Sequence, residues 1–358
     1  VLGVERVGIT DDFFRLGGDS ILSIQASSLL RRSGHDCQVK DLFEHKTVSR
    51  LSSHLDNKAG EVAVQSEQGE LHGELGLLPI QQWFVSRVSS GELPVPNHWN
   101  QSFLVRVPEL ETDRLEAAVE GLVRQHDALR IKYDTSGHEW KQLYATDMPS
   151  PGLRVMDVGG RTPAAIQREL TQWQSGFDLS QGPLYQVGYL HGYGDGTARV
   201  YFALHHMIVD SVSWRILLED LRALYQGHQL GAKGSSYRQW TALMGSYPER
   251  HPAEAAYWSS QLSGMPSYGS MQVGETAHTA LRLPKGLTKS LLQRAPKAYN
   301  TEVNDLLLTA LAYALADIGG GTVQGVTLEG HGREPIEETI DHSNTVGWFT
   351  SMFPVRLE

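Results

Sequence analysis

A polar segment at residues 57–76 is the feature that most constrains how this chain can fold. It includes the run Gln65-Ser66-Glu67-Gln68 and has almost no apolar periodicity, so it offers no face that could be buried against a core. At 358 residues the chain is long enough for about two or three cores of ordinary domain size. We therefore predict a small module over residues 1–56, a linker over 57–76 and a larger domain over 77–358.

Apolar spacing indicates different folds for the two modules. Residues 20–32 have the spacing of a helix, with Ile21, Ile24 and Leu29 on one face, and residues 48–56 read as a second helix. The larger domain mixes both periodicities, with expected helices at 112–128, 214–226 and 301–316 and expected strands at 198–204 and 322–328. The fold class expected is a small all-α bundle followed by an α/β (α+β) domain.

The composition excludes several classes of function. The formal net charge is −10, whereas nucleic-acid binders usually carry a basic patch because phosphate neutralisation supplies much of their affinity. No apolar run approaches the ~20 residues of a membrane span, and Val1–Thr10 lacks the apolar core of a secretion signal. Cys37 is the one cysteine, so no internal disulfide can form, which fits a reducing cytosol. We therefore expect a cytoplasmic protein with neither nucleic acid nor a membrane as partner.

Ser20 lies where the first expected helix begins, behind Gly17 and Gly18. The N-terminus of a helix offers free N–H groups and the positive end of the dipole, which favour a phosphate there. The glycines would let the active site of another protein approach the backbone closely. Serine is also a preferred N-capping residue, so these residues alone leave a simple helix cap open.

The residues around Ser20 resemble the attachment site of peptidyl carrier domains in non-ribosomal peptide synthetases. The matching run is Asp11-Asp12-Phe13-Phe14-Arg15-Leu16-Gly17-Gly18-Asp19-Ser20-Ile21, with Leu42-Phe43 and Val48 matching later parts of the domain. The resemblance implies that a phosphopantetheinyl transferase attaches 4′-phosphopantetheine to Ser20, where it holds an aminoacyl or peptidyl group as a thioester. Asp19 is the variant often found when an epimerization domain follows. The first helix of the family is missing, so we expect an N-terminally truncated carrier domain.

Two adjacent histidines, His205 and His206, directly follow the expected strand at 198–204. Neighbouring residues at a strand end point to opposite sides, so only one of the two can face a given cavity. Histidine is a natural base near neutral pH, because its usual pKa is about 6.5. For a bare pair of histidines, a structural role is still the commoner outcome. No further histidine or carboxylate has the tight spacing of zinc motifs, so we predict no metal site.

The stretch from His205 to Trp214 resembles the His-His-x-x-x-Asp motif of the condensation and epimerization superfamily, which has a chloramphenicol-acetyltransferase-like fold. The matching residues are His205-His206-Met207-Ile208-Val209-Asp210-Ser211-Val212-Ser213-Trp214, with Ser211 where the family usually has glycine. The ending Ser213-Trp214 is more like epimerization domains than condensation domains. The resemblance implies that His206 is the base facing a substrate tunnel, that Asp210 is structural and that His205 supports the loop.

Inversion of an α-carbon requires removal of a proton from one face and return of a proton to the other. Two groups on opposite faces are the simplest arrangement for this, with pKa values tuned towards neutrality by burial. Glu329 is a candidate for the second group, because it follows an expected strand and is flanked by glycine. Taken alone, it is one of 41 acidic residues and reads as an exposed loop glutamate.

The segment around Glu329 resembles the Glu-Gly-His-Gly-Arg-Glu motif of epimerization domains, which condensation domains generally lack. The resemblance implies that Glu329 is the opposite-face acid or base and that His331 and Arg333 shape the site. Other segments that resemble motifs of these domains are Leu78-Pro79-Ile80-Gln81-Gln82-Trp83-Phe84, Asn97-His98-Trp99-Asn100-Gln101-Ser102, Arg124-Gln125-His126-Asp127-Ala128-Leu129-Arg130 and Asn344-Thr345-Val346-Gly347-Trp348-Phe349-Thr350-Ser351. His342 and Asn344 depart from the residues more often found there, a hydrophobic residue and Arg.

Together these resemblances imply a carrier domain followed by an epimerization domain, which interconverts the L and D forms of an aminoacyl or peptidyl thioester on Ser20. Two alternatives stay open: a condensation domain that forms peptide bonds with the same histidine, and a non-catalytic domain that only docks carriers. The family extends past the position of Glu358, so we expect an incomplete second lobe. We also expect an adenylation domain before Val1 and a condensation domain after Glu358.

Overall fold

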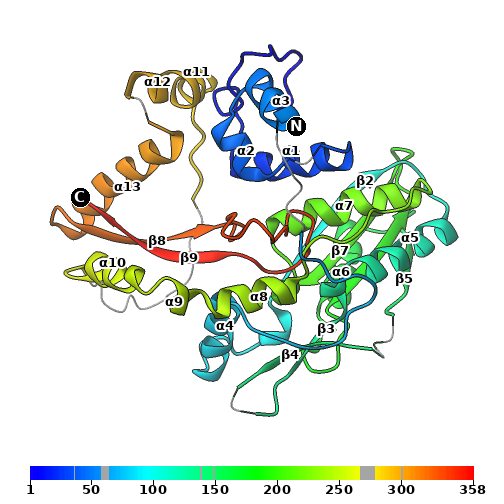
Figure 1. Cartoon of the computed structure of the whole chain (residues 1–358). Helices are drawn as coiled ribbons and strands as arrows, with labels where there is room; N and C mark the ends of the chain where they lie inside the picture. Colours follow the sequence, from blue (N-terminus) through cyan, green and yellow to red (C-terminus); the bar gives the residue numbers. More distant parts are fainter. Residues whose placement is uncertain are drawn as a thin grey trace. The chain divides into compact units, whose positions relative to one another are not determined.

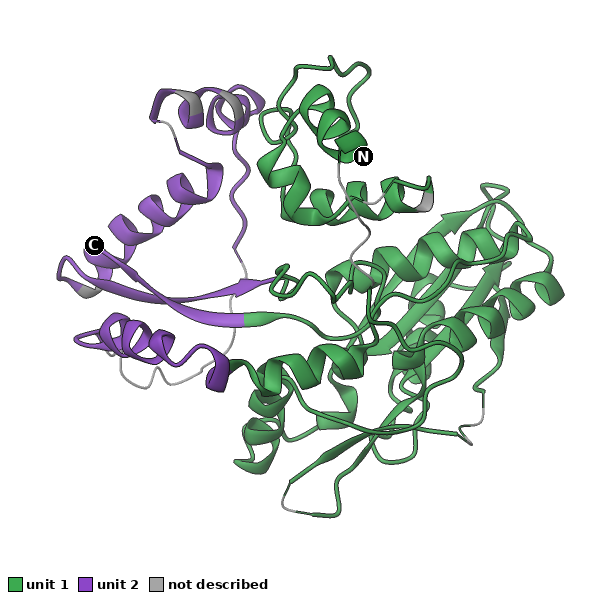
Figure 2. Cartoon of the chain, viewed as in Figure 1, with its two compact units in different colours: residues 1–247, 331–351 green, residues 248–330, 352–358 purple. Residues whose placement is uncertain are grey.

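The computed structural model describes residues 1–35, 37–57, 64–137, 139–146, 148, 150–266, 279–299 and 301–358. The chain forms two compact units (Figure 2). The first combines Val1–Tyr247 with His331–Ser351, and the second combines Pro248–Gly330 with Met352–Glu358. Both expected modules contribute to the first unit, so these units cut the chain differently from the predicted boundaries.

The N-terminal module is helical. It contains α1 (Ser20–Arg32), α2 (Val39–Glu44) and α3 (Val48–Asn57), of which α1 and α3 match the expected helices. Its small core consists of Cys37, Leu42 and Leu51, and apolar side chains of α1 and α3 pack against them. The short helix α2 was not predicted, because six residues are too few to display a 3.6-residue period.

In the structure, the second half of the segment 57–76, which we expected to be a linker, packs with the larger domain. Residues 58–63 lie outside the described residues, but Leu71 and Leu75 are buried. The strand β1 (Gly73–Leu75) pairs antiparallel with β4 (Lys141–Tyr144), so this part of the segment belongs to the larger domain. Buried leucines at positions 71 and 75 supply the apolar contacts that an unstructured linker lacks.

The main sheet of the first unit contains β2 (Asn100–Val107), β7 (Ala198–His205), β6 (Tyr185–His191) and β5 (Leu153–Asp157), in that spatial order (Figure 1). Neighbouring strands run antiparallel except β5 and β6, which are parallel. The central strand β7 is the one expected at 198–204. It is buried on both faces along almost its whole length.

The helices α5 (Thr112–Gln125) and α7 (Ser211–Tyr225) lie side by side, with Gly121 facing Leu224 (Figure 1). The helix expected at 112–128 ends three residues early and is followed by the 3₁₀ turn η2 (Asp127–Arg130). His126 leaves the helical conformation there, and its Nε2 lies 3.0 Å from Asp220 Oδ2 on α7. A long-range contact therefore sets this helix end.

Further elements surround the main sheet. The smaller sheet has the order β1-β4-β3, with β3 at Ile131–Asp134. The remaining helical elements of this part are α4 (Pro79–Ser89), η1 (Pro96–His98), α6 (Pro163–Gln174), η3 (His206–Ile208) and α8 (Tyr237–Gly245). The short helix α9 (Tyr247–Arg250) leads from the first unit to the second.

The second unit holds β8 (Gln324–Gly330), which pairs with β9 (Ser351–Leu357). Its helices are α10 (Ala253–Leu262), α11 (Lys285–Lys289), η4 (Ser290–Arg294), α12 (Ala295–Tyr299) and α13 (Val303–Gly319). The helix expected at 301–316 and the strand expected at 322–328 correspond to α13 and β8. Within the described ranges, no helix combines the length and apolar character needed to cross a membrane.

Candidate active site

The paired histidines lie at the junction of β7, η3 and α7. His205 is the last residue of β7, and His206 begins η3, where its N–H donates to Trp99 O at 2.8 Å. Asp210 then caps α7, since its Oδ1 accepts a hydrogen bond from Ser213 N at 2.7 Å. A strand end and a capped helix start thus hold the loop between them.

His205 is completely buried and stays neutral. Its Nε2 lies 2.8 Å from Pro96 O, a group that can only accept, so Nε2 carries the proton. Its Nδ1 accepts from Met207 N at 3.2 Å. Burial lowers the pKa of His205 to about 4. With both ring nitrogens used by the backbone, His205 braces the loop.

His206 is only half-buried, and its ring sits between residues of three elements. Its Nε2 lies 2.8 Å from Nε2 of Gln101, a residue on β2. The other end of that amide, Gln101 Oε1, accepts the indole N–H of Trp214 from α7 at 2.7 Å. The rings of His206 and Trp348 have centroids 4.6 Å apart. His206 is therefore held by Gln101 on one side and Trp348 on another.

A buried ion pair fixes the start of α7. One terminal nitrogen of Arg333 lies 3.2 and 3.1 Å from the two carboxylate oxygens of Asp210, and 3.0 Å from Ser213 Oγ. Burial lowers the pKa of Arg333, and the charge of Asp210 acts in the opposite direction. Asp210 also accepts from Phe349 N at 3.2 Å. The carboxylate is thus occupied with structural contacts.

Arg333 also organises the segment that carries Trp348. Its other terminal nitrogen donates to the carbonyls of His342 and Thr345, both at 2.8 Å, and its guanidinium lies 3.7 Å from the centre of the Phe349 ring. Ser213 Oγ bonds with Gly347 O at 3.0 Å and Gly347 N at 3.1 Å. These contacts fasten residues 342–349 to α7 and so bring Trp348 against His206.

His331 and Gly332 lie in the same unit as Arg333. His331 Nδ1 accepts from Arg333 N at 3.0 Å. Gly332 has a φ of +65°, and a Cβ there would come within 1.7 Å of Phe349 O. Glycine is required at this position because the backbone of Phe349 lies too close for a side chain.

Glu329 lies in the second unit, whereas His206 and the supporting residues lie in the first. It occupies β8, and its side chain is exposed. Its role on the opposite face of the substrate stays a prediction. Among the described residues, no cluster of three His, Cys, Asp or Glu side chains could hold a metal ion.

Ser20 is the first residue of α1, and the cap of that helix is Asp19, whose Oδ1 accepts from Leu22 N at 2.7 Å. Ser20 is half-buried and lies in the first turn of α1, where helix N–H groups can face a phosphate. Gly17 has a φ of +105°, and a Cβ on Gly18 would lie 2.3 Å from the Phe13 ring. The glycines shape the turn before Ser20, and the site fits a covalent phosphopantetheine because the serine is not used as a cap.

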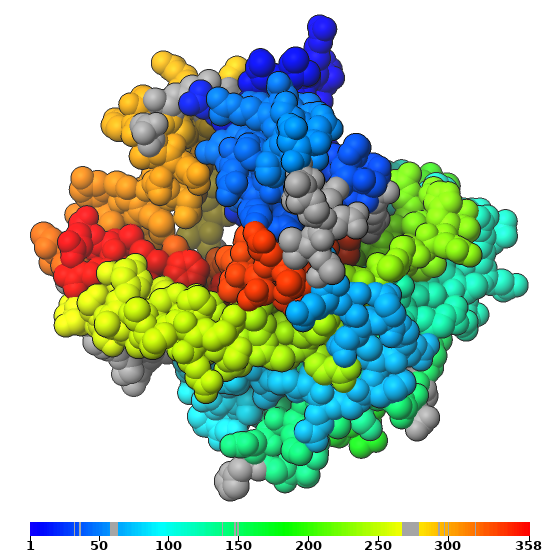
Figure 3. Space-filling view, viewed as in Figure 1, coloured from blue at the N-terminus to red at the C-terminus, as the bar shows by residue number. Residues whose placement is uncertain are grey.

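The helix α1 contacts the segment 341–344 of the larger domain. Arg31 forms an ion pair with Asp341 and donates to Ser343 Oγ at 2.6 Å. Ser28 Oγ lies 2.6 Å from Asn344 Oδ1. In Figure 3 this orange-red segment lies directly against the blue N-terminal helices. The N-terminal module thus packs on the loop that precedes Trp348.

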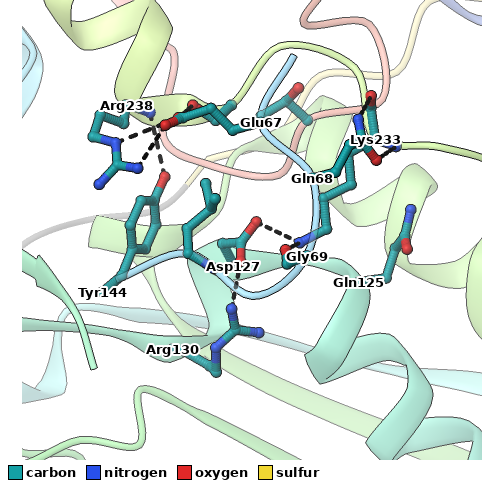
Figure 4. A network of polar contacts seen from close by, with 12 residues as sticks. Glu67, Gln68, Gly69, Gln125, Asp127, Arg130, Tyr144, Lys233 and Arg238 are labelled. Atoms are coloured by element: carbon teal, nitrogen blue, oxygen red, sulfur yellow. Dashed lines mark hydrogen bonds and ion pairs between the residues drawn. The ribbon is translucent and has the colours of Figure 1, made fainter. Parts of the chain in front are cut away.

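A polar network fastens residues 67–69 to the larger domain (Figure 4). Lys233 lies 2.7 Å from Asp127, which also pairs with Arg130. Glu67 lies 2.6 Å from Arg238. Burial would raise the pKa of Glu67, but hydrogen bonds from Arg238 and Ser236 outweigh it and the pKa is lowered. A cavity of about 430 Å³ adjoins this network, and its charged groups are engaged with each other. We assign the network a structural role.

The sequence assigned no separate role to Gln101 or Trp348, although both lie in segments that resemble motifs of the family. Gln101 pairs with Leu204 across the β2–β7 ladder, which places it beside the end of β7 where the histidines lie. This strand pairing joins residues about 100 positions apart, so no local sequence pattern places Gln101 beside the histidines. The motif around residues 97–102 was the available signal for Gln101.

Comparison with known protein families gives two matches. The family described as Phosphopantetheine attachment site matches residues 1–55, and the family described as Condensation domain matches residues 72–358. The second match starts just before β1, in agreement with the burial of Leu75. Phosphopantetheine is therefore the covalent cofactor of the N-terminal module, as the residues around Ser20 predicted.

Curated relatives cover nearly the whole chain. N-(5-amino-5-carboxypentanoyl)-L-cysteinyl-D-valine synthase of Amycolatopsis lactamdurans is 43% identical over 98% of this chain, and the enzyme of the same name from Penicillium rubens is 40% identical over 99%. One of the linear gramicidin synthase proteins of Brevibacillus parabrevis is 40% identical over 100%. The chain spans only 10%, 10% and 7% of the lengths of these relatives.

A solved structure of an epimerization domain has a fold similar to that of this chain. The epimerization domain from the third module of tyrocidine synthetase B superimposes with a TM-score of 0.71 and 32% sequence identity, over 83% of this chain and 69% of that one. The first condensation domain of the calcium-dependent antibiotic synthetase shares the fold, with a TM-score of 0.62 and 21% identity, over 79% of this chain and 68% of that one. The chain belongs to the condensation-domain family of non-ribosomal peptide synthetases, and a phosphopantetheine-carrying domain precedes its condensation-type domain.

Proposed function

We propose that the larger domain epimerizes the α-carbon of an aminoacyl or peptidyl thioester carried on Ser20, from L to D. The observation that carries this proposal is the state of His206, a half-buried imidazole whose Nε2 faces the amide N–H of Gln101 and is therefore an acceptor. An imidazole with an acceptor nitrogen is suited to take up a proton near neutral pH. The motif around Glu329 and the likeness to an epimerization domain support the same activity.

The names of the relatives are in accord with this proposal. Two of them make a product that contains a D-valine residue, according to their names. A D residue in such a product requires a step that sets the configuration of its α-carbon. We propose that the matching segment of this chain performs that step on its own substrate.

When bound to Ser20, 4′-phosphopantetheine would hold the substrate as a thioester, which acidifies the hydrogen on its α-carbon. His206 accepts this hydrogen as a proton on Nε2, and the electron pair of the broken C–H bond moves into the carbonyl group of the substrate. Glu329 then delivers a proton to the opposite face of the α-carbon, and the electron pair returns to form the new C–H bond. His206 then loses its extra proton to water and Glu329 regains from water the proton that it delivered, so the cycle is balanced.

The supporting residues keep His206 in place during this exchange. His205 braces the loop, and Asp210, Arg333 and Ser213 tie the start of α7 to the segment that carries Trp348. A phosphopantetheinyl transferase and neighbouring adenylation and condensation domains are the partners that this role requires. We also propose that the protein works in the cytosol, where one free cysteine is unremarkable.

The test follows the α-carbon directly. Ser20 is loaded by a phosphopantetheinyl transferase from an L-aminoacyl coenzyme A, in deuterated water, and mass spectrometry with chiral analysis follows deuterium uptake and the D fraction. Wild type should gain deuterium as the D fraction grows. His206→Ala should slow both by about 10²-fold or more, as expected for loss of a general base. Glu329→Gln should reduce inversion more than exchange, because His206 still removes the α-proton.

Each alternative has its own outcome. If loaded wild type neither exchanges nor inverts but forms a peptide bond with a second loaded carrier, the domain is a condensation domain. If it does neither, the domain only docks carriers. Ser20→Ala, which cannot be loaded, controls for exchange of unattached substrate.

A further inference from the structure

We infer that Gln101 is a positioning residue that selects the tautomer of His206, and that Trp214 orients Gln101 for this task. The role of His206 as a base rests on the proposed function, whereas its tautomer follows from the contacts alone. The three side chains come from β2, η3 and α7 and form one chain of hydrogen bonds, Trp214 to Gln101 to His206.

The donor and acceptor roles in these two hydrogen bonds follow from Trp214. The indole nitrogen of Trp214 can only donate, so the Gln101 atom 2.7 Å away must be the amide oxygen. The amide nitrogen of Gln101, which also can only donate, then points at His206 Nε2 at 2.8 Å. His206 Nε2 must therefore accept, and in the neutral ring the proton lies on Nδ1. The Trp214 N–H therefore determines which end of the Gln101 amide is the oxygen and which end is the nitrogen.

Other contacts hold Trp214, Gln101 and His206, the three members of this hydrogen-bond series, in place. The Trp214 ring packs edge-on against Phe103 at 4.3 Å and lies near Phe202, so the indole N–H has a fixed direction. Gln101 is held by the eight-residue pairing of β2 with β7, one residue of which is its partner Leu204. The main chain of His206 is bound to Trp99 O at 2.8 Å. Both partners of the amide are thus fixed before a substrate arrives.

This arrangement suits a base more than an acid. The lone pair of Nε2 accepts from one group at a time, so the α-hydrogen of a bound substrate takes the place of the Gln101 N–H. After proton transfer, Nε2 carries a hydrogen and would face the Gln101 N–H as a second donor. The amide therefore favours the unprotonated Nε2 and prepares the lone pair for proton removal. A glutamate at this position would do the opposite, because its carboxylate accepts a hydrogen bond from a protonated Nε2.

The first experiment reads the tautomer without any activity. The full chain is labelled with ¹⁵N-histidine, and NMR at neutral pH distinguishes protonated from unprotonated ring nitrogens, with His206→Ala identifying the signals. Wild type should show an unprotonated Nε2 on His206. Gln101→Glu should protonate it, and Trp214→Phe should give a mixture of tautomers, because the amide can then turn over. Gln186→Glu is the matched control: Gln186 is a buried glutamine of the same sheet whose Oε1 accepts from Arg154 at 2.9 Å, and it should leave the His206 signals unchanged.

The second experiment measures α-hydrogen exchange of the loaded chain against pH. Gln101→Glu should lose about 10-fold or more of the rate at neutral pH and recover as the pH is raised, because the carboxylate holds a proton on the base. His206→Ala should not recover. A protonated Nε2 in wild type, or a Gln101→Glu chain with unchanged NMR signals and an unchanged pH profile, would overturn the inference. If the NMR results are as expected but wild type shows no exchange, the proposed epimerization fails and the role of Gln101 in tautomer selection stands.

Discussion

At the scale of single residues, burial decides the chemical state of the histidines. His205 and His342 are both buried, and burial lowers the pKa of His205 to about 4 and that of His342 to about 3. Arg333 lowers the pKa of His342 further through its charge. Both rings are therefore neutral in the folded chain at physiological pH. His206, the base in the proposed function, is by contrast only half-buried.

These two histidines make stability depend on pH. An unfolded histidine takes up a proton near pH ~6.5, whereas His205 and His342 resist it when folded, so the unfolded state binds more protons below that pH. Their contribution is complete above about pH 6.5 and is lost as the pH falls towards about 4 for His205 and about 3 for His342. Each can reduce the free energy of unfolding by up to about 1.4 kcal/mol per pH unit.

Urea unfolding between about pH 7 and about pH 5, above the range where most carboxylates titrate, measures this slope. His342→Phe keeps an aromatic ring beside Trp240 and Phe349 but cannot titrate. It should flatten the decline of stability with falling pH. Equal slopes in wild type and variant would mean that His342 does not contribute.

At the scale of elements, two neighbouring residues at the start of α1 have different roles, one in the stability of the helix and the other in its modification. Asp19 caps the helix, and Ser20 follows it as the attachment site. A serine that capped the helix would have its oxygen engaged with the backbone. The division of labour explains how the modified residue can sit at a helix start without weakening that helix.

Asp19→Ala and Ser20→Ala test this division. Asp19→Ala should destabilise the N-terminal module by about 1 kcal/mol, the usual cost of a lost N-cap, and still accept phosphopantetheine. Ser20→Ala should change stability by less than about 0.5 kcal/mol and abolish loading. Thermal unfolding and the mass of the loaded chain provide the two measurements. A larger loss of stability in Ser20→Ala than in Asp19→Ala would show that Ser20 is the cap.

At the scale of the whole molecule, the first unit joins two domain families through the contacts of α1 with residues 341–344. Arg31 lies at the centre, with Asp341 and Ser343 as its partners. The side chains of Arg31 and Asp341 are each 19% exposed, so their ion pair is partly shielded from water. Asn344, which departs from the family pattern, contacts Ser28 in the same place. The loop that leads to Trp348 is therefore also a surface for the carrier domain.

A charge swap tests this contact. Arg31→Glu places two carboxylates together and should reduce single-turnover exchange by about 5- to 30-fold, equivalent to about 1–2 kcal/mol. Adding Asp341→Arg should restore most of the rate, because the pair is then reversed. Arg50→Glu on α3, an exposed residue of the same domain, is the control and should leave the rate unchanged. If the double variant is no faster than Arg31→Glu, the two residues do not pair during turnover.

Local patterns in the sequence were sufficient for the helices α1, α3, α7 and α13, for the strands β7 and β8, and for the residues that define the family. Their information lies within about twenty consecutive residues, because helix and strand periods, caps and motifs are all short-range properties. The buried leucines at 71 and 75 lie before the predicted limit of the larger domain at 77, and two residues are too few to show a period.

Only the tertiary structure decided how the site is assembled. Asp210 and Arg333 are 123 residues apart, Ser213 and Gly347 are 134 apart, and Gln101 and His206 are 105 apart. Each contact depends on sheet register and on how a distant segment packs on α7, which no local pattern encodes. The sequence determined which residue could act as a base. The tertiary structure decided which nitrogen of that residue holds the lone pair, because hydrogen-bond partners from other elements set the tautomer.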